Sequence, residues 1–215
     1  MKIAIQLLFA MATLTRVLAQ ATVPEPPREA DDAASKGLRT LRSLTTETSL
    51  RTMGFSSVAE LAKTQLGTPI PVYFVSLSAI RSFEPGSDPN ALLKATEKYL
   101  YPVKLGPMVV SSIVVQKTKE GWDATELGDT NLGKSVTQAV TKSAESGRIP
   151  MNLYFAIEIP ALNLYFVGHH NDRQLLLQSI SDISAINLQA GKEEPAEAIF
   201  RLLKTSSEKS YNAPS

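Results

Sequence analysis

The chain has 215 residues, and its 22 Lys and Arg residues nearly balance its 21 Asp and Glu residues, giving a formal net charge of +1. A nucleic-acid-binding domain typically shows a clearly basic surface, so we expect no nucleic-acid partner. The chain contains no cysteine, which excludes disulfides, thiolate chemistry and cysteine-based metal sites. The protein must therefore fold on its hydrophobic core alone.

The first 21 residues predict a signal peptide. Lys2 supplies a short positive region, residues 3–14 form an apolar run, and Ala19-Gln-Ala21 fits the small-x-small pattern of a cleavage site. The run is shorter than the roughly 20 residues of a membrane-spanning helix, although an uncleaved anchor remains the alternative. No later segment suits a membrane span, and the chain lacks an Asn-x-Ser/Thr glycosylation site. We therefore expect a periplasmic or secreted bacterial protein, cleaved after Ala21.

The rest of the chain divides into three parts. Residues 22–34 are rich in proline and charge and predict an extended linker. Residues 35–204 predict a single α+β domain, and residues 205–215 a flexible polar tail. The domain begins with an amphipathic helix at 35–49, in which leucines recur every third position among basic residues. Its basic side could meet anionic lipid, but a solvated helix face is the preferred interpretation.

The next elements follow from local signals. Ser57-Val-Ala-Glu60 is a capping box that starts a helix. Residues 71–80 predict a central strand, and Asp88-Pro89 the start of a helix that continues through Thr96. Residues 108–118 and 122–127 then form a hairpin in which Trp122 is a core or hairpin-stabilising residue rather than a ligand-stacking one.

The second half of the chain continues this pattern. A helix capped by Asp129 carries the apolar stripe Leu132, Val136, Ala139 and Val140 and ends at Gly147. Residues 174–180 predict a strand, and Glu194-Pro195 opens a last helix. Hairpins outnumber strand–helix alternations, so we expect an α+β fold with a mainly antiparallel sheet built from hairpins and helices packed on one face.

The most informative stretch is residues 150–168, which contains the string Asn-Leu-Tyr-Phe twice. Period-two alternation places Phe155, Ile157 and Ile159 on one face of a strand. A reversal at Pro160-Ala161 pairs them with Phe166, Leu164 and Leu162, and a loop longer by two residues preserves the same matching of faces. The sequence therefore predicts a hairpin with one core face.

The opposite face of this hairpin is the candidate binding surface. It would carry Asn152, Tyr154, Glu158, Asn163, Tyr165 and His169, with the two tyrosines as diagonal neighbours. Tyrosine combines an apolar ring with a hydrogen-bonding tip, which suits contacts with a protein, peptide, glycan or lipid of the cell envelope. An ordinary solvent face, or one covered by a helix, is the plainer alternative.

The two histidines raise a second hypothesis. His169 and His170, followed by Asp172, could hold a divalent metal or supply a general base in a hydrolase. Neighbouring strand residues point to opposite faces, however, and no spacing marks further ligands. No nucleophile or phosphate-loop motif occurs. We therefore expect a non-catalytic binding or accessory protein with no metal, no cofactor and no catalytic residues, and keep the enzyme centred on these residues as the alternative.

Overall fold

The computed structural model describes residues 23–128, 132–146, 149–171 and 174–211, so the predicted signal peptide lies outside it. The described residues form a nine-stranded sheet with five α-helices. Eight strands follow the order β5 (Gly121–Leu127), β4 (Met108–Thr118), β3 (Lys94–Leu105), β2 (Ile70–Phe74), β6 (Phe155–Ile159), β7 (Leu164–Asn171), β8 (Gln174–Ser179) and β9 (Glu193–Pro195). The short β1 (Gln65–Leu66) pairs with β3. The α+β class with a mainly antiparallel sheet is confirmed.

One pair of strands in the middle of the sheet is parallel. β2 and β6 run in the same direction, whereas the other neighbouring pairs are antiparallel. The sheet thus consists of two antiparallel halves, β2–β5 and β6–β9, which meet at this central seam. The seam places β6, the first strand of the predicted hairpin, in the interior of the sheet.

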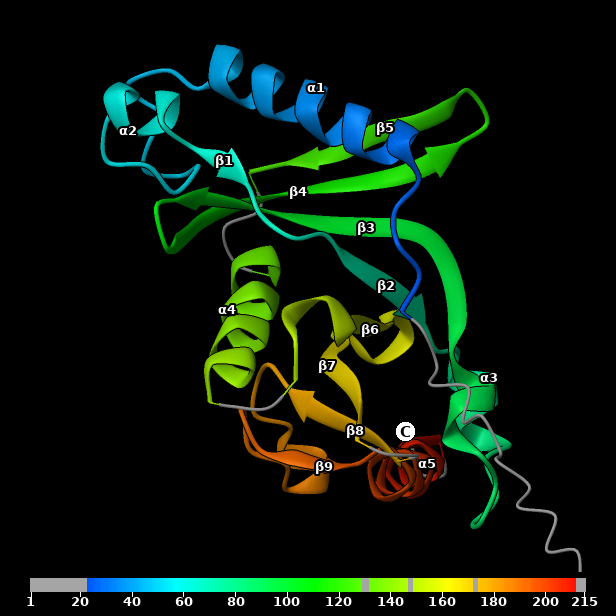
Figure 1. Ribbon diagram of the computed structural model, residues 1–215. Helices are drawn as coiled ribbons and strands as arrows, with labels where there is room; N and C mark the ends of the chain where they lie inside the picture. Colours follow the sequence, from blue (N-terminus) through cyan, green and yellow to red (C-terminus); the bar gives the residue numbers. More distant parts are fainter. Residues whose placement is uncertain (1–22, 129–131, 147–148, 172–173, 212–215) are drawn as a thin grey trace, which may run out of the picture.

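The helices lie on both faces of the sheet. We call one the α1 face, because α1 (Arg28–Leu44) covers Tyr101 and Ile113 there. On the same side, α3 (Leu77–Arg81) and α5 (Ala196–Tyr211) cover Ile157 and Phe166. We call the other the α4 face, where α4 (Leu132–Glu145) packs on alternate apolar residues, among them Val114. In Figure 1, α1 lies along β4 and β5, and α5 is seen end-on near β8 and β9.

The expectation that all helices share one face is therefore wrong for α4. The reason is that β4 is apolar on both faces: Ile113 and Val115 contact the α1 layer, while Val114 between them contacts Val136 and Val140 of α4. A strand with two apolar faces requires cover on both sides. Among the described residues, no helix is both long and apolar enough to cross a membrane.

The N-terminal boundary differs from the prediction. α1 begins at Arg28, so residues 28–34 are helical rather than extended linker. Its buried side is formed by small residues, Ala30, Ala33, Ala34 and Gly37, followed by leucines. A Cβ at Gly37 would lie 2.8 Å from Cβ of Ala124, so the helix approaches β5 closely. Small residues allow this approach but carry little hydrophobic signal in sequence, which explains the misplaced boundary.

Other boundaries shift for local reasons. The strand expected at 71–80 ends at Phe74, because the Ser76 side chain accepts the backbone N–H of Ala79 and caps α3. Asp88 caps a 3-10 turn, Pro89–Leu92, instead of a helix reaching Thr96. The capping box opens α2 (Val58–Ala62) as predicted, although Glu60 accepts from the backbone N–H of Ser56 rather than Ser57. The predicted cap Asp129 and stop Gly147 lie outside the described residues.

The central hairpin has the predicted matching of faces with the longer loop. Phe155 lies opposite Gly168, Ile157 opposite Phe166, and Ile159 opposite Leu164. The connection is a 3-10 turn ending at Asn163, which adopts a left-handed conformation (φ 52°) that asparagine tolerates well. The β4–β5 hairpin is also confirmed, and the Trp122 ring packs near that of Tyr99, with centroids 5.7 Å apart.

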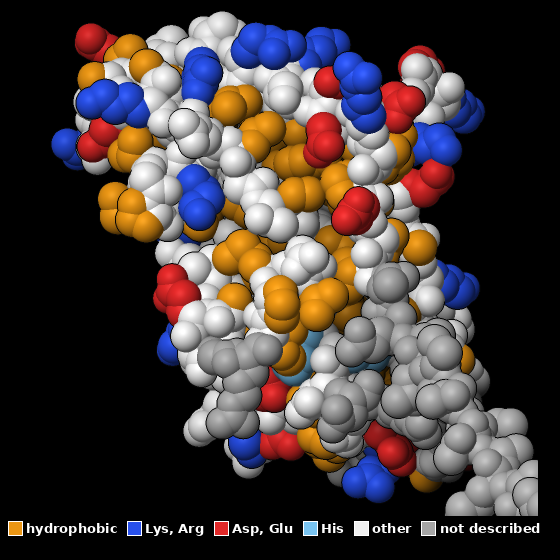
Figure 2. All heavy atoms as spheres, in the orientation of Figure 1, with side chains coloured by type: hydrophobic (Ala, Val, Ile, Leu, Met, Phe, Trp, Pro, Cys, Tyr) orange, Lys and Arg blue, Asp and Glu red, His pale blue; other side chains and the backbone are white. Residues whose placement is uncertain are grey.

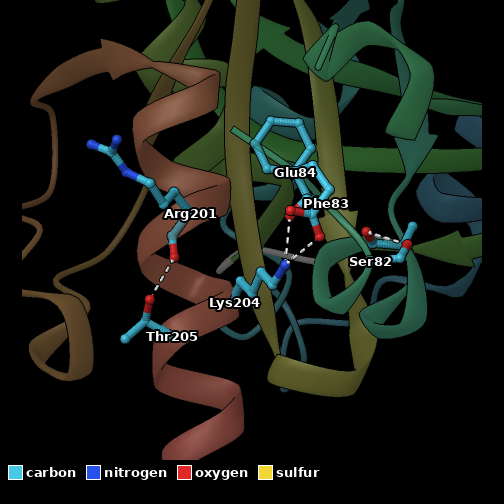
Figure 3. A network of polar contacts seen from close by, with 7 residues as sticks. Ser82, Phe83, Glu84, Arg201, Lys204 and Thr205 are labelled. Carbon is cyan, nitrogen blue, oxygen red and sulfur yellow. Dashed lines mark hydrogen bonds and ion pairs between the residues drawn. The ribbon is translucent and has the colours of Figure 1, made fainter. Parts of the chain in front are cut away.

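The C-terminal helix extends beyond the predicted boundary. α5 continues to Tyr211, so residues 205–211 of the expected flexible tail are helical. Near the middle of the helix, Lys204 Nζ donates to the carbonyl of Phe83 (2.8 Å) and to the Glu84 carboxylate (3.0 Å). Figure 3 shows Lys204 pointing from α5 to the chain that follows α3. This contact fixes α5 over the α1 face of the second half.

Candidate functional site

Of the six residues predicted to share a binding face, Tyr154, Glu158, Tyr165 and His169 do lie on the α4 face of the hairpin, but they are spread along it and do not form one cluster. Asn152 lies in a 3-10 turn before β6, Glu158 forms an ion pair with Lys98 (3.0 Å), and Asn163 occupies the hairpin turn. Tyr165 lies opposite Glu158, and Glu158 is four residues further along the chain than Tyr154. The expectation that the two tyrosines are neighbours is therefore wrong, because the hairpin loop is two residues longer than the tight turn at Pro160-Ala161 and shifts the pairing.

Tyr154 and His169 do come together. Their ring centroids are 5.1 Å apart in an edge-to-face arrangement, and both side chains are almost fully buried, with 3% and 4% exposure. Next to this pair along the hairpin, Ala156 and Val167 lie in the apolar cluster that α4 covers. Much of the predicted open face is thus core, in agreement with the alternative of a face covered by a helix.

A cavity of about 500 Å³ lies beside this pair, and we call it the α4 cavity. Its wall on one side is the C-terminal part of α4, and on the other the α4 face of β7, β8 and β9. The lining residues are Lys142, Ser143, Ser146, Ile149, Tyr154, His169, Asn171, Gln178, Gly191 and Glu193. Figure 2 shows histidine atoms at the bottom of a recess in the lower half of the molecule, below a group of hydrophobic side chains. The volume falls within the range of roughly 300–1,000 Å³ typical of small-molecule sites.

His169 is the most unusual residue in the lining. Its Nε2 lies 2.6 Å from Oε2 of Glu193. Because a carboxylate can only accept, Nε2 carries the hydrogen and donates it. Nδ1 is buried and has no hydrogen-bond partner among the described residues. In a neutral imidazole this atom is a buried acceptor without a donor, which costs about 1–3 kcal/mol relative to a satisfied group.

Two further features set the polarity of the cavity. Burial raises the pKa of Tyr154, and the Glu193 carboxylate raises it further, so the phenol stays protonated across the physiological range. Ser143 donates to Oε1 of Gln178 (2.7 Å), which joins the end of α4 to β8. This bond occupies the amide oxygen of Gln178 and leaves its NH₂ group as the remaining donor.

His170 lies on the opposite face of β7. Its Nε2 is 2.8 Å from Oδ1 of Asn90, and its ring centroid is 5.6 Å from that of Phe155. Burial lowers the pKa of His170, His169 lowers it further, and Asp88 partly opposes both. The two histidines therefore serve different surroundings and cannot share one metal ion.

The described residues do not supply the ligand set of a metal centre. They contain no group of three or more His, Asp or Glu side chains placed to hold a metal ion. The described partner of His169 is a carboxylate, and Ser143 in the same cavity donates to Gln178 instead of to the imidazole. Asp172, the third residue of the predicted histidine site, lies outside the described residues.

Sequence reasoning identified Tyr154 and His169 but missed Glu193, Gln178 and Ser143. Glu193 stands just before the expected start of the last helix and gives no strand signal, because β9 is only three residues long. Alternation along 174–179 does place Gln178 on the same face as Gln174 and Leu176, but nothing in the sequence indicates that α4 ends beside it.

Comparison with known proteins gives no assignment. A scan against protein-family models, a search of curated proteins and a search of solved structures each found no match. The functional argument therefore rests on the geometry of this chain.

Proposed function

We propose that the protein is an exported, non-catalytic binding or accessory module of the bacterial cell envelope, and that its ligand occupies the α4 cavity. Export is supported by the signal-peptide pattern that ends at Ala21. Binding is supported above all by one observation: the buried Nδ1 of His169 has no hydrogen-bond partner among the described residues and belongs to a residue that lines a cavity. Buried polar groups are normally satisfied, so a ligand that donates to this nitrogen would remove a standing cost.

The hydrolase or metal-dependent enzyme centred on His169, His170 and Asp172 is less well supported. His169 and His170 face opposite sides of the sheet, and the described residues supply no hydroxyl bonded to either imidazole. The His169–Glu193 pair by itself orients an imidazole but offers no nucleophile.

Native mass spectrometry on protein purified gently from the envelope fraction of its own host tests the proposal. We expect a polypeptide that begins after Ala21, with a stoichiometric added mass. His169→Leu should lose the added mass, and the matched control His170→Leu, one residue along the strand on the other face, should retain it. Full-length protein in the cytoplasm would contradict export. A bare protein, or equal loss in both variants while both remain folded by circular dichroism, would contradict the assignment of the α4 cavity.

A further inference from the structure

The two halves of the sheet are arranged as an internal pseudo-repeat. Counting outward from the seam, β2, β3, β4, β5 and then α4 correspond in order to β6, β7, β8, β9 and then α5. The seam strands are parallel, and α4 and α5 lie on opposite faces. A rotation of about 180° around an axis along the seam therefore exchanges the halves and, with them, the two faces of the sheet.

This relation shows what the second half lacks. In the first half, α1 covers β4 and β5 on the α1 face. The corresponding position is the α4 face of β8 and β9. No described helix runs along these two strands on that face; α4 meets β8 at its C-terminal end through Ser143 and Gln178. The α4 cavity lies at this position, so the pseudo-repeat explains why a cavity exists there.

The cavity is lined differently from the surface under α1. Tyr101, Val103, Ile113 and Val115 offer α1 an apolar surface. The cavity offers His169, Asn171, Gln178 and Glu193 from β7–β9 instead. A second helix like α1, which docks through alanines and leucines, would bury these polar groups without partners, at a cost of about 1–3 kcal/mol each. The fitting occupant is therefore polar.

The lining also indicates the charge and hydrogen-bonding character of the ligand. Among the described lining residues, Lys142 and Glu193 offset each other and the Tyr154 phenol is uncharged, so these residues together favour neither sign of charge. The lining both donates and accepts: Nδ1 of the neutral His169 imidazole is an acceptor, the Gln178 amide NH₂ is a donor, and the Asn171 amide offers both. A hydroxyl group both donates and accepts, so a ligand that carries several hydroxyls can answer all three.

We infer that the α4 cavity binds a neutral, hydroxyl-rich small molecule, a saccharide of one or two rings. The inference rests on the proposed binding function and names its ligand class. Ligand hydroxyls donate to His169 Nδ1 and accept from the Gln178 amide, and the C–H face of a ring lies against Ile149 and the Tyr154 ring, the apolar part of the lining.

Saturation-transfer NMR titrations of the full mature chain test this with maltose, cellobiose and N,N′-diacetylchitobiose as neutral probes. Cellobiouronate, which carries a carboxylate, and the deacetylated chitobiose, which carries amines, are their charged disaccharide counterparts. We expect saturable binding of at least one neutral probe and at least tenfold weaker binding of both charged ones. Gln178→Ala should weaken binding about tenfold, as expected for one lost hydrogen bond of about 1.4 kcal/mol. The matched control, Gln174→Ala, removes an exposed glutamine from the same face of β8 outside the α4 cavity and should change nothing.

The outcomes separate this inference from the proposed function. If no neutral probe binds at millimolar concentration but native mass spectrometry finds another ligand that depends on His169, the ligand class is wrong and the binding function stands. If neither experiment finds a ligand, both fall. Equal weakening by Gln174→Ala and Gln178→Ala, with thermal unfolding unchanged, would place the saccharide outside the α4 cavity and overturn the inference.

Discussion

Gly168→Ala tests the packing of the hairpin that carries His169. Gly168 lies on β7 directly opposite Phe155. A Cβ built at Gly168 would lie 2.6 Å from Cε2 of Phe155, 3.0 Å from Cζ and 3.1 Å from Cδ2. The Phe155 ring is 1% exposed and packs between the rings of Tyr73 and His170, so it has little room to move. One added methyl group must therefore displace a ring in the middle of the core.

The magnitude follows from two opposing effects. Overpacking of this kind destabilises by about 1–3 kcal/mol, and replacing glycine by alanine returns about 0.4–1 kcal/mol through the unfolded chain. We expect Gly168→Ala to lower the free energy of unfolding by about 1–2 kcal/mol, which for a chain of this size corresponds to a fall in Tm of about 2–8 °C. Urea titration and thermal unfolding by circular dichroism measure both quantities.

A matched glycine provides the control. At Gly67 the first contact of an added Cβ is Cδ of Lys104 at 2.9 Å, part of a flexible side chain, and the next is Cβ of Pro102 at 3.2 Å, so Gly67→Ala should cost no more than about 1 kcal/mol, less than Gly168→Ala. Phe155→Leu should relieve the strain, making Gly168→Ala less costly in that background than in the wild type. A neutral or stabilising Gly168→Ala would refute the close packing of β6 against β7 on which the position of His169 depends.

Two further predictions concern contacts outside the α4 cavity. Because the native pKa of His170 is lowered, the unfolded chain binds more protons than the native one, so His170 contributes stability above the unfolded pKa of about 6.5 that is lost as the pH falls toward the native pKa. The Tm difference between wild type and His170→Gln should therefore shrink from pH 8 to pH 5. A difference that grows would contradict the lowered pKa. Lys204→Met keeps the aliphatic stem but leaves the carbonyl of Phe83 unpaired, so the urea midpoint should fall by the equivalent of about 1 kcal/mol. Glu84→Gln, at the exposed partner of the same lysine, should have almost no effect, and a reversed order of these two variants would show that the backbone contact is not the stabilising one.

The sequence was most informative where hydrophobic residues alternate. The repeated Asn-Leu-Tyr-Phe strings predict the matching of faces in the central hairpin, because a loop change of two residues preserves parity. The same strings do not determine the length of the loop. The loop length decides which residue is the neighbour of Tyr154, and in the structure that neighbour is His169 and not Tyr165. Helix boundaries were predicted poorly where small residues form the packing surface, as at Ala30 and Ala34 in α1.

The candidate site was only partly accessible to sequence reasoning. The sequence indicates His169 and Tyr154 through their chemistry and their place in the hairpin. Glu193 could not be paired with His169 from sequence, since the two are joined across β8 by a strand order that includes the three-residue β9. The position of the α4 cavity depends on α4 crossing to the other face of the sheet. No local pattern in residues 132–145 specifies a face, because an apolar helix stripe fits either side of a sheet that is apolar on both.

The parallel seam has a consequence for how the chain folds. The antiparallel pairs form between strands close in sequence, whereas Val72 of β2 lies beside Ala156 of β6, which is far along the chain. Closing so long a loop costs entropy before the contact stabilises anything, so long-range pairings of this kind form slowly. The meanders β3–β5 and β6–β8 are expected to form first and to dock along the seam last. One wall of the α4 cavity comes from α4, which follows the first meander, and the other from strands of the second meander. The cavity would therefore be completed only at that final step.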